Sequence, residues 1–455
     1  MKVLWLCNVM LPVIAAQLGL EASNKEGWLS GLAHVVLKKR QENGITLMVA
    51  APAPKELFAE DEIVCKHEVE TPDGRISFFG FREDTTCPHI YDSALEHAMK
   101  MIAEAAEPDV VHCFGTEYPH TLAMCRAFPR KERLLISIQG LCAVYANTYF
   151  ASMPERVIRS VTLRDFLKRD SIKEQQRKFA LRGEMEIEAV KLAKNVSGRT
   201  PWDKFYTELW NPEAQYFTLN ETLRPDFYSE QWDAAGVQPH TIFLSQGDYP
   251  IKGLHYMLEA LPAIREKYPD TKVYVAGNSL VNYATLKQKL KISAYGKYLR
   301  QLIRRNRLED SVCFLGRLNA EQMKEQYLKS HLFVCCSTIE NSPNSLGEAM
   351  LLGMPCVSAD VGGITGVFLG EKDGILYEGY RTSQNEFDNM RYGKGAELTL
   401  EEIAKNLADS VISIWSDETR MHEYCENARN HARKNHDREQ NYTKMKEVYA
   451  KISER

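Results

Sequence analysis

Short apolar runs that alternate with stretches of helical periodicity occur twice along this 455-residue chain. In the first half the apolar runs lie at 2–7, 45–50, 76–81, 110–114 and 134–138, with helical patterns at 27–37 and 94–106 and another short strand candidate at 195–200. In the second half they lie at 241–246, 272–276, 312–315, 332–336 and 355–359, separated by helical patterns at 254–266, 298–306, 320–328 and 346–352. Strands that alternate with helices indicate parallel sheets covered on both faces. The chain is therefore predicted to be α/β, with two doubly wound Rossmann-like domains.

The chain is too long for one ordinary core, and the pattern restarts after a break near 233–239. We predict a first domain over 1–235 and a second over 236–429. The charged tail is helical, and its last part, 430–455, is expected to return to the first domain. Two such domains would face each other across a cleft at the carboxyl ends of their strands, where α/β proteins bind ligands.

The composition is that of a soluble globular protein, with 44% hydrophobic and 26% charged residues. A net charge of −4 excludes a globally basic nucleic-acid binder, and no nucleic-acid partner is predicted. Residues 3–20 imitate a signal peptide, but only Lys2 precedes them, and Asn8, Pro12 and Gln17 interrupt the run. We therefore predict a cytoplasmic protein whose eleven cysteines, which lack CxxC spacing, are reduced and buried.

The stretch 337–355 passes from a polar turn into a helix directly after an apolar run. Pro343 suits the first turn of that helix, and Ser342 could cap it. The amides of Asn344, Ser345 and Leu346 would then point outward at the positive end of the helix dipole. Such a helix N-terminus is a ready anion site, and a phosphate is the expected ligand.

Glu340 and Glu348 flank this turn, eight residues apart. Carboxylates accept hydrogen bonds from sugar hydroxyls while backbone amides hold a phosphate, so a diphosphate with hydroxyls on either side would suit the arrangement. Two alternatives stay open. Glu348 could merely complement the helix dipole, or the two carboxylates could act as the acid and nucleophile of a retaining hydrolase, which would leave the phosphate-binding turn unexplained.

The segment 156–182 carries nine basic and three acidic residues, and its apolar positions are sparse. A solvated helical face is the simplest interpretation. The alternative is a basic face that contacts an anionic membrane surface, or a phosphorylated acceptor.

Several of these residues, in this order, resemble the retaining nucleotide-sugar glycosyltransferases of family 4, which have the two-domain GT-B fold. Glu340 to Glu348 resembles the Glu-x7-Glu motif of that family, and Lys252-Gly253 resembles its basic Lys-Gly turn. The runs at 273–277, 314–316 and 353–357 resemble the strands between these motifs. The resemblance covers nearly the whole chain and is weakest over 151–182.

The resemblance implies roles for these positions. Glu348 would bind the ribose hydroxyls and Glu340 the donor-sugar hydroxyls, with Lys252 neutralising the leaving group. The diphosphate would be held by the amides around Asn344, Ser345 and Leu346. Nucleotide contacts are also expected from Gly27, Gly316 and Arg317.

The first half offers Glu117, Gln139 and Arg199 at strand ends, as acceptor or sugar contacts or as ordinary surface and packing residues. Two departures from the family pattern stand out. Gly247 occupies the place of an arginine, and Gln139 that of a histidine. Phosphate neutralisation is therefore expected to depend on Lys252 and another cation such as Arg199.

The function implied is transfer of a sugar from UDP- or GDP-sugar to a hydroxyl of a glycan or lipid-linked glycan, with retention of configuration, in cell-surface or exopolysaccharide synthesis. No cofactor is implied beyond the donor substrate, and with no DxD pair or His cluster no metal site is predicted. In this family the departing phosphate oxygen takes the acceptor proton. A non-catalytic nucleotide-sugar-binding partner with the same fold is the alternative, and a GT-B epimerase or phosphorylase is a third class.

Overall fold

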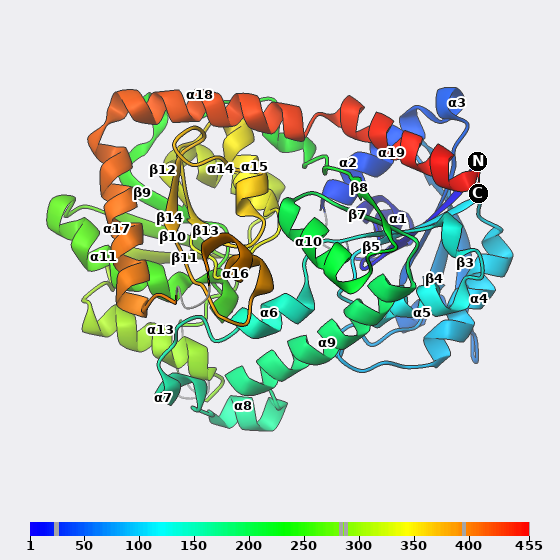
Figure 1. Ribbon diagram of the computed structural model, residues 1–455, viewed down its shortest axis with the longest axis horizontal. Helices are drawn as coiled ribbons and strands as arrows, with labels where there is room; N and C mark the ends of the chain where they lie inside the picture. The colour runs from blue at the N-terminus through cyan, green and yellow to red at the C-terminus, as the bar shows by residue number, and fades with distance from the viewer. Residues whose placement is uncertain (22–26, 282–284, 286–289, 394–396, 455) are drawn as a thin grey trace. The chain divides into compact units, whose positions relative to one another are not determined.

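The computed structural model describes residues 1–21, 27–281, 285, 290–393 and 397–454 (Figure 1). They form two compact units. The first consists of Met1–Ala143, Leu181–Arg224 and Asn435–Arg455, and the second of Val144–Ala180 and Pro225–Lys434. Each unit contains one sheet, and no helix among the described residues is long and apolar enough to cross a membrane.

The sheet of the first unit has eight strands in the order β3-β4-β2-β1-β5-β6-β7-β8. The strands are β1 (Lys2–Cys7), β2 (Thr46–Pro52), β3 (Val64–Thr71), β4 (Gly74–Phe81), β5 (Val110–Phe114), β6 (Leu134–Ser137), β7 (Asn195–Gly198) and β8 (Gln215–Thr218). All neighbours pair in parallel except β3 and β4, which form an antiparallel pair.

Helices connect these parallel strands, as crossovers must. They are α1 (Pro12–Gln17), α2 (Gly27–Lys38), α3 (Arg40–Asn43), α4 (Ala94–Ala106), α5 (Pro119–Ala127) and α10 (Pro201–Trp210). Two more, α6 (Cys142–Thr148) and α9 (Ile172–Leu192), cross the boundary between the units, which falls after Ala143 and after Ala180. The last helix of the chain is α19 (Arg438–Ser453). The C-terminal α19 packs against α2 and β5. Its Tyr449 hydroxyl accepts a hydrogen bond of 2.9 Å from the indole of Trp5 on β1.

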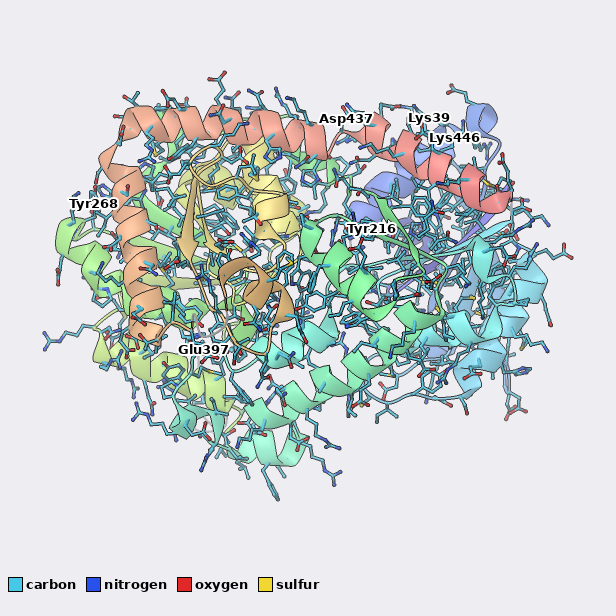
Figure 2. The ribbon with its side chains drawn as sticks, in the orientation of Figure 1. Lys39, Tyr216, Tyr268, Glu397, Asp437 and Lys446 are labelled. Atoms are coloured by element: carbon cyan, nitrogen blue, oxygen red, sulfur yellow. The ribbon has the colours of Figure 1, made fainter. Side chains whose placement is uncertain are left out.

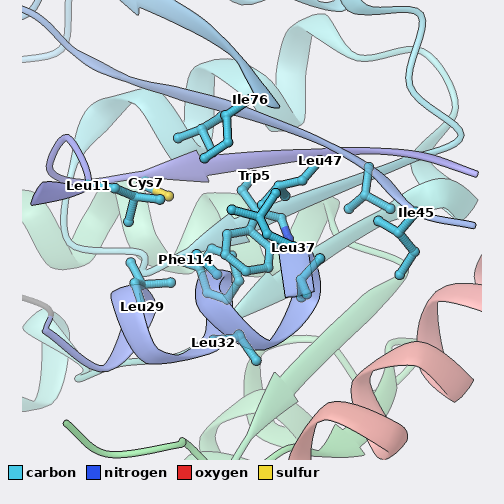
Figure 3. Close-up of a cluster of buried hydrophobic side chains, with 14 of the residues drawn as sticks. Trp5, Cys7, Leu11, Leu29, Leu32, Leu37, Ile45, Leu47, Ile76 and Phe114 are labelled. Atoms are coloured by element: carbon cyan, nitrogen blue, oxygen red, sulfur yellow. The ribbon is translucent and has the colours of Figure 1, made fainter. Parts of the chain in front are cut away.

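The core of the first unit lies between the central strands and α2 (Figure 3). The rings of Trp5 and Phe114 meet edge to face with centroids 5.1 Å apart, and Leu29 and Leu37 of α2 belong to the same cluster. Burying one such side chain contributes about 1.5–3 kcal/mol. The apolar runs at 2–7 and 110–114 are therefore what fixes the centre of this sheet.

The second unit has a parallel sheet of six strands in the order β11-β10-β9-β12-β13-β14. The strands are β9 (Gln238–Leu244), β10 (Lys272–Ala276), β11 (Val312–Gly316), β12 (Ser330–Cys335), β13 (Cys356–Asp360) and β14 (Ile375–Glu378). The helices are α7 (Glu155–Ile158), α8 (Leu163–Lys168), α11 (Leu254–Lys267), α13 (Ala294–Arg305), α14 (Ala320–Lys329), α15 (Asn344–Leu352), α16 (Glu386–Tyr392), α17 (Leu400–Ser416) and α18 (Glu418–Asn435).

The predicted α/β class with two doubly wound sheets is confirmed. The sequence interpretation missed β3, β8 and β14. Each of these is the outermost strand of its sheet or, for β3, an antiparallel addition to its edge. Their residues alternate between buried and exposed or are only partly buried, so they lack the continuous apolar run of a central strand.

The units also differ from the predicted domain limits. Pro225 already belongs to the second unit, and Asn435 begins the return to the first. The segment Val144–Ala180, predicted within the first domain, is part of the second unit. Two buried hydrogen bonds hold it there: His255 Nε2 contacts the carbonyl of Ala151 at 2.8 Å, and the Ala294 amide donates to Asp165 at 2.8 Å.

Candidate active site

The order of the strands reverses between β9 and β12, which lie side by side in the second unit. From β9 the chain proceeds outward to β10 and β11 on one side, and then to β12, β13 and β14 on the other. In open α/β sheets ligands bind outside the carboxyl ends of the strands at such a switch point. Lys252 follows β9 and Glu340 follows β12, so both candidate residues lie at this edge.

Lys252 and Glu340 form an ion pair of 2.7 Å between Nζ and Oε1. The side chains are 19% and 9% exposed, so the pair is largely withdrawn from water. The Ser337 hydroxyl donates to the same Oε1 at 2.7 Å. Burial works against the charge of Lys252, but Glu340 and the neighbouring Tyr249 outweigh it and hold the pKa of Lys252 well above its usual value. Lys252 is therefore a permanent cation at this edge.

Two glycines fix the loop that carries Glu340. Gly253 has φ +69°, and a Cβ on it would lie 1.8 Å from the carbonyl oxygen of Cys336. Gly362 has φ +53°, and a Cβ on it would lie 2.2 Å from the carbonyl oxygen of Glu340. That oxygen accepts a hydrogen bond of 2.9 Å from the amide of Gly363. The loop is thus held on both sides by backbone that tolerates no side chain.

The helix after Glu340 starts one residue later than predicted. α15 begins at Asn344, with Pro343 in an extended conformation as its N-cap and no side-chain cap, so the predicted cap by Ser342 is wrong. The amide of Leu346 donates to the Pro343 carbonyl at 3.0 Å, so this amide is not available to a phosphate as predicted. The amides of Asn344 and Ser345, in the first two positions of the helix, have no intrahelical acceptor, so for them the predicted contact with a phosphate stays a prediction.

Two further polar groups belong to α15. The buried Oδ1 of Asn344 has no hydrogen-bond partner among the described residues, which is an unusual condition for a buried carbonyl. Tyr327 donates its hydroxyl to the Ser345 carbonyl at 2.9 Å, which ties the first turn to α14. Glu348 is 3% exposed.

Gly316 ends β11 at the same edge of the sheet, and Arg317 follows it. Gly316 has φ +76°. Arg317 Nε donates to Asn278 Oδ1 at 3.0 Å, and Asn278 Nδ2 donates to Asp248 Oδ2 at 3.2 Å. These contacts link the loops after β11, β10 and β9. Sequence reasoning did not single out Asn278 or Asp248.

Gly247, where the resemblance implies an arginine, is closed by packing. A Cβ on it would lie 2.8 Å from both Leu254 Cδ2 and Val275 Cγ1. We expect Gly247→Ala to lower the free energy of unfolding by about 1–3 kcal/mol through overpacking, and Gly247→Arg to lower it further. Chemical denaturation measures both, with Gly236→Ala as the control because its Cβ would meet no atom within 4 Å. Equal stability of the Gly247→Ala protein and the control would contradict the packing argument.

In the first unit, Gln139 and Arg199 lie together. Arg199 Nη2 donates to the Gln139 carbonyl at 2.8 Å, and both line a cavity of about 30 Å³. Trp28, which follows Gly27 at the start of α2, lines it as well. A cavity of this size encloses a few water-sized groups and no sugar ring.

Arg199 forms a buried ion pair with Glu221, and each side chain is 5% exposed. Its charge is therefore already opposed within the first unit, which weakens the prediction that Arg199 neutralises the phosphates. Sequence reasoning missed Glu221 because it follows β8, a strand that was itself missed.

Glu117 lies in a separate buried polar cluster at the ends of β1 and β5, where the strand order of the first unit reverses. Burial raises the pKa of its carboxyl. Arg182 Nε donates to the Glu117 carbonyl at 2.8 Å. Glu186 of α9 accepts from the Thr116 hydroxyl at 2.6 Å and from the Ala143 amide at 3.0 Å. The charged surroundings of Glu186 in the sequence gave no sign that it is buried.

Burial raises the pKa of Glu186 to about 8. Between pH 4.5 and about pH 8 the folded chain therefore holds a proton on Glu186 that the unfolded chain has lost. As the pH rises through this range, the contribution of Glu186 to the free energy of unfolding falls. Glutamine cannot ionise, so the Glu186→Gln variant should not show this fall. We expect its free energy of unfolding, relative to that of the wild type, to increase from about pH 5 to pH 8. Denaturant unfolding across this range measures it, with the exposed Glu184→Gln as control. If the free energy of unfolding changes with pH in the same way in the wild type and in both variants, Glu186 does not have the raised pKa.

The structure thus brings Lys252, Glu340 and the start of α15 to one switch point, together with Gly316 and Arg317 on neighbouring loops. Gly27, Gln139 and Arg199 lie in the first unit, and Glu117 lies there in a different cluster. Among the described residues no group of three or more His, Cys, Asp or Glu side chains is placed to hold a metal ion.

Comparison with known proteins finds a family match for part of the chain. Residues 227–388 match the family model described as glycosyl transferases group 1. An uncharacterized glycosyltransferase of Methanocaldococcus jannaschii is 28% identical over 124 residues, which is 27% of this chain and 28% of that relative. The matched part thus spans little more than a quarter of the curated relative.

Solved structures resemble the chain over nearly its full length. Sucrose-phosphate synthase from Thermosynechococcus elongatus has a TM-score of 0.63 at 16% identity, covering 99% of both chains. HepE of Anabaena in complex with UDP and glucose has a TM-score of 0.63 at 15% identity, again covering 99% of both. WaaG, a glycosyltransferase involved in lipopolysaccharide biosynthesis, has a TM-score of 0.54 at 14% identity, covering 94% of this chain and 95% of that one. The fold is GT-B, and the family match lies within its second unit.

Proposed function

We propose that this chain is a retaining glycosyltransferase that moves a sugar from a nucleoside diphosphate sugar to a hydroxyl acceptor. The observation that carries the proposal is the Lys252–Glu340 ion pair at the switch point of the second unit. Lys252 follows β9, and Glu340 lies on the loop that leads into α15. The group 1 match covers this site. The Anabaena neighbour, which has been solved with UDP-glucose, supports a UDP-sugar as the first donor to test, and a GDP-sugar is the alternative.

The donor phosphates would meet the amides of Asn344 and Ser345, with Lys252 as the nearest fixed cation. Transfer builds negative charge on the departing diphosphate, and preorganised donors aimed at that charge supply the largest part of such a rate enhancement. Because the ion pair with Glu340 holds Lys252 protonated, no proton has to be gained before it acts. Arg317, exposed on the loop after β11, is a better candidate than Arg199 for a second cation.

Glu340 would hold the donor sugar. Lys252 and Ser337 both donate hydrogen bonds to its Oε1. In the described part of the chain no bond reaches Oε2, which leaves that oxygen to accept from a sugar hydroxyl. Glu348 would accept from the ribose hydroxyls. The departing phosphate oxygen would take the acceptor proton, which leads to front-face attack with retention and requires no metal.

For the acceptor we propose a glycan or lipid-linked glycan in cell-surface or exopolysaccharide synthesis, in the cytoplasm or at the inner face of the membrane. The role of WaaG in lipopolysaccharide biosynthesis supports this choice. Glu117, Gln139 and Arg199 remain the candidate acceptor contacts in the first unit. The size of the cavity beside Gln139 limits any contact there to a protruding group of the acceptor.

The test begins with a thermal-shift panel of UDP- and GDP-sugars, since a ligand at a hundred times its dissociation constant stabilises by about 2.7 kcal/mol. The stabilising donor is then incubated with glycan acceptors, and release of the nucleoside diphosphate and the anomeric configuration of the product are measured. We expect release that depends on the acceptor, retention, and no loss of rate with a chelator. Donor binding without turnover on any acceptor would favour the non-catalytic binding protein, and an inverted product would overturn retention.

A further inference from the structure

The short helix α8 of the second unit exposes large apolar side chains to solvent. Phe166 is 73% exposed and Leu167 is 71% exposed. Leu163, on the same helix, and Val161, just before it, are also more than half exposed. Soluble proteins expose single apolar side chains freely, but a contiguous group of them marks an interaction surface.

This exposure does not arise from a loosely held segment. Thr162 and Asp165 form a capping box at the start of α8. Asp165 is 2% exposed and accepts from the Ala294 amide of α13 at 2.8 Å. Arg164 contacts Asp165 at 3.0 Å and Asp170 at 2.7 Å. The polar side of α8 is therefore fixed on the unit, which leaves Phe166 and Leu167 facing outward.

A hollow of about 550 Å³ adjoins the start of α8 and has both apolar and basic walls. Its apolar lining comes from Val161, Leu163, Leu290 and Ile292, and its basic lining from Lys297, Arg300 and Arg304. Lys168, Arg169 and Lys173, on and just after α8, are exposed as well. We call the apolar residues of α8, this hollow and these three basic residues the α8 surface.

The positive charge of the α8 surface is not balanced locally. The acidic residues of the segment are engaged elsewhere: Asp165 is buried, Asp170 contacts Arg164 and Lys178, and Glu174 contacts Arg177. By contrast, Lys168, Arg169, Lys173, Lys297 and Arg304 have no acidic partner among the described residues. An apolar centre with a basic surround suits a partner that is apolar inside and anionic at its surface.

We propose that the α8 surface docks on an anionic lipid bilayer, with Phe166 and Leu167 inserted among the acyl chains and the lysines and arginines over the phosphate headgroups. A second copy of the chain that docked through the same surface would bring positive charge against positive charge and be repelled. The proposal takes up the membrane contact that is one of the two alternatives for 156–182 and assigns it to α8 and the adjoining face of α13. The proposal goes beyond sugar transfer, and its test measures binding alone.

The experiment is flotation of the full chain with phosphatidylcholine vesicles, with and without phosphatidylglycerol, at low and high salt. We expect retention only on the phosphatidylglycerol vesicles, and release at high salt because exposed charges are screened. Phe166→Ser with Leu167→Ser, and separately Lys168→Glu with Lys173→Glu, should each lower retention about tenfold or more. All four side chains are exposed, so the variants are expected to unfold at the wild-type temperature.

Two matched controls keep the result specific. Ile90→Ser removes an apolar side chain that is 60% exposed in the first unit. Lys444→Glu with Lys446→Glu reverses two exposed lysines of α19, one of which Figure 2 labels. Both controls should float like the wild type. The proposal is overturned if neutral vesicles retain the chain equally well, or if both α8 variants are retained like the wild type. It is also overturned if no vesicles retain the chain and α8 instead mediates self-association or binding to acidic proteins.

Discussion

Replacing Glu340 by glutamine is expected to lower donor turnover about 10²–10³-fold, the range observed when one preorganised transition-state contact is lost. The same change should reduce the free energy of unfolding by about 3 kcal/mol, because it leaves the largely buried Lys252 ammonium without a counter-charge. Nucleoside diphosphate release and denaturant unfolding measure the two effects on the same protein.

A double-mutant cycle separates the pair from its parts. Lys252→Met should cost about as much stability as Glu340→Gln, whereas the double variant should be less destabilised than the sum, because neither charge is then left alone. Glu325→Gln is the matched control, since its pair with Lys329 is more than half exposed on both sides and should contribute less than about 1 kcal/mol. Lower stability with unchanged turnover would show that Glu340 is structural and would remove the central support for the proposed function.

Central strands were predictable because burial on both faces leaves a continuous apolar run. β1, β5 and β10 occupy the residues predicted for them, at 2–7, 110–114 and 272–276. The edge strands β3, β8 and β14 have no such run, and only their neighbours in the sheet define them. The segment 144–180 belongs to the second unit through tertiary contacts, among them two hydrogen bonds between residues more than a hundred positions apart, which no local pattern encodes.

The site divides in the same way. Glu340 could be found because it follows a strand pattern and flanks the predicted phosphate-binding turn, and Lys252 because Lys252-Gly253 resembles the Lys-Gly turn of the glycosyltransferase family. The parallel order of the strands places their carboxyl ends at one edge. The direct contact of Lys252 with Glu340, and the hydroxyl of Ser337 behind it, are tertiary facts. The error at Leu346 came from a helix boundary placed one residue early, a common uncertainty at helix ends. Glu221 and Glu186 were missed because a buried carboxylate looks in sequence like an exposed one.

Gly362→Ala is expected to have the second large effect, although Gly362 carries no chemistry. At φ +53° an alanine incurs about 1–2 kcal/mol of backbone strain. Its Cβ would also lie 2.2 Å from the Glu340 carbonyl oxygen, so the loop must move, at a further cost of about 1–3 kcal/mol. Gly316→Ala is the matched control for stability, because its φ is also positive, at +76°, while no atom lies within 4 Å of its Cβ. The difference between the two variants measures the steric part alone.

The movement should also disturb catalysis through Glu340, because the Gly363–Glu340 hydrogen bond of 2.9 Å and the contact with Lys252 depend on this loop. We expect Gly362→Ala to lower donor turnover at least tenfold in the wild type and to have little further effect once Glu340 is already glutamine, since coupled residues are not additive. The measurement is donor turnover of the wild type, Gly362→Ala, Glu340→Gln and the double variant, each well below its unfolding temperature. An equal loss in both backgrounds would mean that Gly362 acts on the donor site by a route that does not involve Glu340.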